Sequence, residues 1–64
     1  MRYRYYCLFR PPMPGAVPRG FVEMEDYGER KIVIEASCVA WGWVEYDHPL
    51  TKQQIDDYEL FPAA

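Results

Sequence analysis

The chain has 64 residues, of which 50% are apolar and 17% aromatic, and its formal net charge is −3. The apolar content excludes a disordered chain. A chain of this length forms one domain, residues 1–64, and buries only about 60% of its unfolded surface. Its aromatic side chains can build a small dense core, which leaves little room for a deep substrate cavity.

The charges are unevenly distributed along the chain. Residues 1–20 carry four arginines and no acid, residues 21–44 carry five acids against two basic residues, and residues 45–64 carry five acids against one lysine. We expect the basic first segment to lie beside acidic neighbours, so that the charges offset one another. The alternative interpretation is a basic patch for an acidic partner or for nucleic acid.

The sequence shows no targeting or membrane-spanning segment. Arg10 and Pro11 interrupt the first residues before the apolar stretch of a signal peptide develops. No apolar run approaches the roughly 20 residues that a transmembrane helix needs. We therefore expect a cytoplasmic protein without membrane association, in which Cys7 and Cys38 are free and buried. A disulfide between neighbouring strands is the alternative for these two cysteines.

Residues 2–9 alternate between two faces, with Tyr3, Tyr5, Cys7 and Phe9 on one of them. This period of two predicts a half-buried strand. Residues 10–20 contain four of the six prolines, which excludes a helix or a central strand there. We expect an ordered loop with polyproline II character that covers one sheet face. The alternative is a loop that presents its apolar residues to a partner.

The middle of the chain predicts two more strand segments. Residues 21–26 form the first, and residues 27–30 form the expected hairpin turn, in which Gly28 is free to adopt a positive φ. Every even position from 32 to 46 is apolar or glycine. A straight strand over this run would span about 50 Å, whereas a chain of this size is about 25–30 Å across. The run must therefore bend or split, at Ala36–Ser37 or at Gly42, and a helix over residues 31–41 is disfavoured by its β-branched residues.

The last third of the chain predicts a strand followed by a short capped helix. Thr51 and Gln54 have the spacing of a capping box, and Leu50 and Ile55 have that of a hydrophobic staple, which together predict a helix over residues 52–60. Pro62 ends it. The predicted fold class is α+β: a small antiparallel sheet of three to four strands, with a proline-rich loop and one short C-terminal helix packed on it.

The segment Trp41–Tyr46 places two indoles on one face of its strand. Trp41 and Trp43 lie opposite Val44 and Tyr46, so one face packs under the helix. The Trp face must be covered by the proline-rich loop or by a partner.

Residues able to carry chemistry are few. The chain has one histidine, one serine and one threonine, and no nucleophile lies near His48 in the sequence. Asp47 and His48, taken with the later acids, match no zinc or calcium spacing. We therefore predict a protein that is not an enzyme and that uses no metal or cofactor.

The predicted function is protein binding. Exposed tryptophans are favoured interface anchors, and the residues assigned to this surface are Trp41, Trp43, Met13, Pro12 and Pro14. The alternative function is binding of single-stranded nucleic acid by cations interleaved with stacking rings, with Arg2, Arg4, Tyr3 and Tyr5 as the site. The sequence pI near 4.9 works against this alternative.

Two further partners stay open. The acidic residues could form a face that mimics nucleic acid in a basic groove of a host protein. An uncovered sheet edge or Trp face could also be buried in a homodimer.

The proline-rich run of residues 10–20, the segment Ala40–Tyr46 and the motifs Pro49-Leu50-Thr51 and Tyr58-Glu59-Leu60 carry a resemblance. Together they resemble small domains associated with phages and mobile elements, of the type carried by large polyvalent proteins of Gram-positive bacteria. The resemblance covers most of the chain. It implies an accessory protein of a mobile element that binds a host or defence component, and it transfers no catalytic residue.

Overall fold

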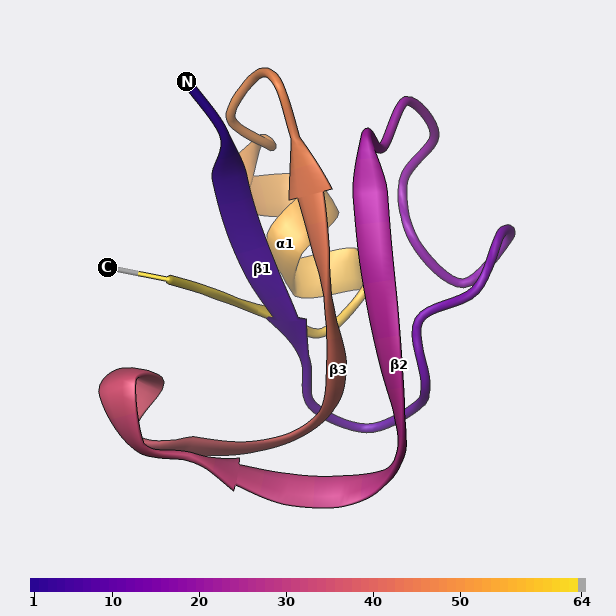
Figure 1. Ribbon diagram of the computed structural model, residues 1–64. Helices are drawn as coiled ribbons and strands as arrows, with labels where there is room; N and C mark the ends of the chain where they lie inside the picture. Colours follow the sequence, from indigo (N-terminus) through magenta and orange to yellow (C-terminus); the bar gives the residue numbers. More distant parts are fainter. Residues whose placement is uncertain (64) are drawn as a thin grey trace.

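The computed structural model describes residues 1–63. In this range, four strands form a single antiparallel sheet, and one α-helix lies behind it (Figure 1). The spatial order of the strands is β2-β3-β1-β4. The elements follow the chain in the order β1 (Tyr3–Cys7), β2 (Glu23–Val33), a 3-10 turn (Ile34–Ala36), β3 (Cys38–Tyr46), α1 (Lys52–Asp57) and β4 (Leu60–Pro62). The predicted α+β class is confirmed.

β1 and β2 follow each other in the chain but are not neighbours in the sheet. β1 lies between β3 and β4, with Tyr6 opposite Trp43 on one side and opposite Phe61 on the other. β1 ends at Cys7, two residues before the predicted end. The proline-rich loop that follows carries the chain around to the far side of β3, where β2 begins (Figure 1).

The predicted hairpin turn at residues 27–30 is wrong. β2 runs through this segment to Val33, and the pairing with β3 shifts register between Asp26 and Lys31. Gly28 does adopt a positive φ of 79°, and its N–H donates to Asp26 Oδ1 over 2.8 Å. This local turn makes a bulge rather than a reversal. The chain reverses at Ile34–Ser37, so the long alternating run is split at Ala36–Ser37, one of the two predicted positions.

The far part of the β2–β3 hairpin bends sharply beyond the bulge (Figure 1). We call residues 31–40 the hairpin arm. Gly42, the other predicted break, lies inside β3 without interrupting it. A side chain at Gly42 would meet the backbone carbonyl of Glu25 and would lie 2.8 Å from the ring of Pro12. Glycine is therefore required here for close approach of the chain, and not for a kink.

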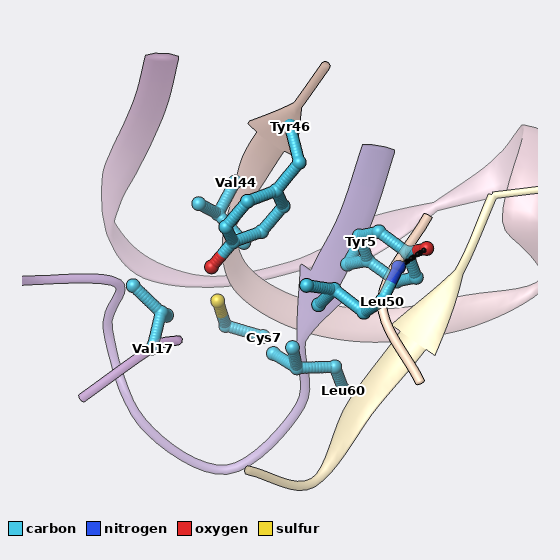
Figure 2. Packing of buried hydrophobic residues seen from close by; sticks show 7 residues of the cluster. All are labelled: Tyr5, Cys7, Val17, Val44, Tyr46, Leu50 and Leu60. Carbon is cyan, nitrogen blue, oxygen red and sulfur yellow. Dashed lines mark hydrogen bonds between the residues drawn. The ribbon is translucent and has the colours of Figure 1, made fainter. Parts of the chain in front are cut away.

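The main core lies between the sheet and the proline-rich loop (Figure 2), and Ile55 of α1 packs against it. Its buried members come from three strands and two loops: Tyr5, Cys7, Val17, Val44, Tyr46, Leu50 and Leu60. The Tyr46 hydroxyl donates to the carbonyl of Pro18 over 2.6 Å, and the Tyr5 hydroxyl accepts from the N–H of Leu50 over 2.8 Å. These two bonds satisfy buried polar groups and tie the loop and the start of the helix to the sheet. The predicted covering of one sheet face by the loop is confirmed.

A second, smaller core lies on the opposite face of the sheet. Its buried members are Tyr6, Val33, Ala40 and Trp43. We expected the Trp face to be covered by the proline-rich loop or by a partner, and that expectation is wrong for Trp43. The hairpin arm supplies the cover, because its bend brings Val33 and Ala40 onto the ring.

The C-terminal segment keeps the predicted cap and adds a strand. Thr51 Oγ1 accepts from the N–H of Gln54, and the Gln54 side chain accepts from the N–H of Thr51, which completes the capping box. α1 ends at Asp57, before the predicted residue 60, and Glu59 adopts a positive φ of 55°. β4 then pairs with β1, and Pro62 is tolerated there because β4 is an edge strand.

Gly42→Ala should destabilise the fold by about 2–3 kcal/mol, because the new methyl group overpacks against a backbone carbonyl that cannot move aside. Gly15→Ala is the matched control: the space around Gly15 is open, so only the strain of its positive φ remains, about 1–2 kcal/mol. Urea unfolding of both variants measures whether Gly42→Ala lowers the free energy of unfolding more than Gly15→Ala does. Equal losses would contradict the close approach at Gly42.

Tyr46→Phe should cost about 1–3 kcal/mol, because it leaves the buried carbonyl of Pro18 without its donor. Amide hydrogen exchange should also become faster in the loop around Val17. Tyr3→Phe is the control, since the Tyr3 hydroxyl has no hydrogen-bond partner among the described residues. Unchanged exchange in the loop would show that this bond does not anchor it.

Candidate protein-binding surfaces

Trp43 lies beneath a charged side chain on the face of the sheet that carries the smaller core. The guanidinium carbon of Arg4 lies 3.9 Å from the centre of the Trp43 ring, within cation–π range. The indole Nε1 donates to Glu25 Oε1 over 3.0 Å. The ring is only 8% exposed. Trp41 is half-buried, so the two tryptophans do not form one open surface. Their role in binding stays a prediction.

The arginines of the first strand are paired with carboxylates. Arg2 contacts Glu23 Oε1 at 2.8 Å and Glu45 Oε1 at 3.3 Å, and Arg4 contacts Glu45 Oε2 at 2.8 Å. The expectation that the basic segment offsets acidic neighbours is confirmed. Tyr5 lies in the main core, on the other face of β1 from Arg4, and Tyr3 is half-buried. The residues assigned to nucleic acid are thus divided between two faces, and that assignment stays a prediction.

Glu45 is the centre of this charge network. Its partial desolvation raises the pKa of the carboxyl group, but the hydrogen bonds and charges of Arg4 and Arg2 outweigh that effect and hold the pKa below its ordinary value of 4.5. The side chain is 13% exposed, so water screens these contacts less than at an open surface.

The proline-rich loop forms an anchored apolar surface. Pro12, Val17 and Pro18 are buried, whereas Met13 is 50% exposed and Pro14 is exposed between them. The N–H of Ala16 donates to the carbonyl of Met13 over 2.9 Å, which closes a turn at the tip. A hollow of about 490 Å³ lies beside this tip, and its lining includes Phe21 and Tyr58. Of the three loop residues predicted to bind a partner, Met13 and Pro14 are exposed to solvent, whereas Pro12 is buried and its ring packs against Gly42.

The hairpin arm carries an apolar patch that the sequence analysis did not assign. Ile32 is 76% exposed, Ile34 is 83% exposed and Val39 is 39% exposed. The alternating run of residues 32–46 gave an indication of this patch, because the run is longer than one small core can bury. The alternation alone did not show which of its side chains would be exposed.

The other side chains considered for chemistry are the two cysteines and His48. Burial raises the pKa of the Cys7 thiol to about 11, with smaller effects from neighbouring charges, and burial also raises the pKa of Cys38. Both cysteines are free; Cys7 is buried as expected, and Cys38 is half-buried. His48 Nδ1 lies 2.8 Å from Asp47 Oδ1 at an exposed turn.

Residues 1–63 contain no group of three His, Cys, Asp or Glu residues arranged to hold a metal ion. No helix in the described part of the chain has the length and apolar character needed to cross a membrane.

Comparison with known proteins adds a family relationship. A family described as "Defence against restriction A C-terminal" matches residues 1–64. The "Defense against restriction protein A" of Escherichia phage P1 is 34% identical over 61 residues, which is 91% of this chain and 9% of that protein. The chain therefore spans only a small part of the length of this relative. No solved structure matches the chain.

The pKa of Glu45 predicts a stability that depends on pH. Because the carboxyl is more acidic in the folded state, its contribution is fully present above pH 4.5 and is lost as the pH falls through the lower folded pKa. Glu45→Gln should lower stability at neutral pH and flatten this acid dependence. Asp57→Asn, on the exposed side of α1, is the control. Thermal unfolding from pH 7 to pH 3 measures both, and parallel curves for Glu45→Gln and the unmodified chain would contradict the network.

Proposed function

The chain belongs to the family of defence against restriction A C-terminal domains, and on that premise we propose that it is a non-enzymatic, protein-binding accessory module that supports a phage in its defence against host restriction. The family relationship supports the phage-associated role. The name of the phage P1 relative supports restriction as the process concerned. On the sequence evidence, the proposed place of action is the host cytoplasm.

The observation that carries the binding proposal is the anchored loop. Buried residues on both sides hold the exposed tip at Met13 and Pro14 in one conformation, and Tyr46 fixes the loop from beneath. A surface already held in its binding conformation loses little conformational entropy when a partner docks. Methionine also adapts its shape to an irregular partner surface.

Binding through the loop is favoured over binding through the first strand. Arg2 and Arg4 already contact carboxylates, and Arg4 also covers Trp43, so a nucleic acid would have to displace these contacts. The loop tip requires no such exchange. Single-stranded nucleic-acid binding remains the alternative, and strong weakening with salt would be its signature.

Met13→Asp should impair protection, because it places a charge where an apolar contact forms. We expect a phage that carries this substitution to plate about 10–100 times less efficiently on a restricting host, as for the loss of an interface anchor. Plating on a non-restricting host should be unchanged. Gln53→Asp, which adds the same charge to the exposed side of α1, is the matched control.

The same variants identify the partner. The immobilised domain should retain a component of the restriction system from host lysate after nuclease treatment and at high salt, and Met13→Asp should release it. Equal plating of the Met13→Asp and control phages on the restricting host would overturn the assignment of the loop. Retention that disappears with nuclease or salt, and with Arg2→Ala and Arg4→Ala, would favour the nucleic-acid alternative.

A further inference from the structure

The hollow beside the loop tip has aromatic walls that the fold holds in place. Phe21 and Tyr58 are both half-buried, and both pack against the main core while they line the hollow. The N–H of Tyr58 donates to the carbonyl of Gln54 over 3.0 Å at the end of α1. On the other wall, the N–H of Val22, next to Phe21, donates to the carbonyl of Glu45 over 2.7 Å. The two rings are thus positioned before any partner arrives.

One cation lines this hollow. Arg19 is exposed, and among residues 1–63 it takes part in no salt bridge, whereas the three arginines before it are each held by a glutamate. None of the described residues that line the hollow is Asp or Glu. The chain as a whole has a net charge of −3, so the hollow has the opposite sign to the rest of the molecule. A carboxylate bound beside the aromatic walls would therefore meet a cation that no described carboxylate already occupies.

The backbone around Arg19 is also fixed. The preceding carbonyl, that of Pro18, accepts the Tyr46 hydroxyl over 2.6 Å. Gly20 follows with a positive φ of 92°, a conformation that glycine adopts without strain. The side chain of Arg19 is therefore the adaptable part of this rim, and its length allows it to reach a group bound in the hollow.

We propose that this hollow binds an extended segment of the partner protein in which an aromatic or aliphatic side chain is adjacent to Asp or Glu. The apolar side chain packs against Phe21 and Tyr58, and the carboxylate pairs with the Arg19 guanidinium. A guanidinium donates two parallel N–H bonds to one carboxylate, which fixes the orientation of the segment. This inference rests on the proposed function, because it names the kind of segment that the loop surface binds.

The size of the hollow suits such a segment. Its volume of about 490 Å³ lies within the range of about 300–1,000 Å³ that is usual for ligand sites. One large side chain with its neighbouring residue fits this space, whereas a folded surface reaches only its rim. The segment can be held without any change in the main core, because both rings already line the hollow.

A nucleic acid is a less suitable occupant, although aromatic rings also stack bases. Its affinity increases with the number of phosphates that are neutralised, and Arg19 is the only basic residue among the described residues that line the hollow. Asp57 and Glu59 flank Tyr58 in the chain and are exposed, so a run of phosphates along this wall would meet further negative charge. A segment with a single carboxylate needs only one cation.

Short blocked peptides test the selectivity of the hollow. Each carries Phe between glycines, preceded by Asp in the first peptide and by Asn in the second, so that the two differ only in charge. NMR titration of the isotope-labelled chain with up to about 10 mM peptide covers the millimolar dissociation constants expected of so short a segment. We expect the amide signals of residues 19–21 and of Tyr58 to shift, and the Asp peptide to bind about threefold more tightly than the Asn peptide.

Charge reversal of Arg19 supplies the matching variant. Arg19→Glu should weaken binding of the Asp peptide at least about threefold and reverse the preference, so that a peptide with Lys before Phe binds more tightly. Arg30→Glu makes the same change at an exposed arginine that does not line the hollow, and it should leave the affinities unchanged. Circular dichroism of both variants verifies the fold, which substitutions at exposed positions should leave intact.

Three results of the titration would overturn the inference: no shift at residues 19–21 and Tyr58, equal affinity for the Asp and Asn peptides, or selectivity that Arg19→Glu leaves unchanged. Tighter binding of a short single-stranded oligothymidine than of the Asp peptide would also overturn it, and would assign the hollow to nucleic acid.

The plating experiment with Met13→Asp tests the proposed function separately. If this variant impairs plating and the peptides show no charge selectivity, the loop surface stands and the inference about its ligand fails. If the selectivity is found and the Met13→Asp phage plates like the unmodified phage on the restricting host, the proposed function fails and the hollow remains a peptide site.

Discussion

The structure depends on β1 being buried on both of its faces. Tyr5 and Cys7 enter the main core beneath α1 and the loop, while Tyr6 enters the smaller core beneath the hairpin arm. In a chain of 64 residues, one strand that serves two cores increases the buried apolar surface without a second layer of helices. Both neighbours of β1 come from the second half of the chain, so β1 is enclosed only after β3 and β4 are in place.

The enclosure of β1 also explains how the aromatic and charged residues are used. Trp43 closes the smaller core, and Arg4 lies over its ring while binding Glu45. The side chains that look most suited to recognition in the sequence are thus occupied within the fold. Several of the apolar side chains that remain exposed lie on the loop tip and on the hairpin arm, among them Met13, Ile32 and Ile34. The binding surface proposed at the loop tip therefore leaves both cores undisturbed.

Local signals predicted local structure well. The capping box at Thr51 and the alternation of Tyr3 to Cys7 are satisfied by residues close in sequence, and both are found. Predictions from the sequence were wrong where one short motif is compatible with two structures. Asp26 and Gly28 form a tight local turn in either a hairpin or a bulge, and only the continued pairing of β2 with β3 decides between them. The brief segment Leu60–Pro62 became a strand because β1 offered it a free edge.

The sequence by itself determined the fold class, the position of the helix start, the loop that covers one sheet face and the offset of the arginines by acids. Each follows from periodicity, capping chemistry or charge, which act over short distances or on average. Only the tertiary structure decided that Trp43 is covered by the hairpin arm, that Pro12 packs at Gly42, and that Ile32 and Ile34 stay outside. Each of these outcomes depends on contacts between segments that are far apart in the chain, which no single segment encodes.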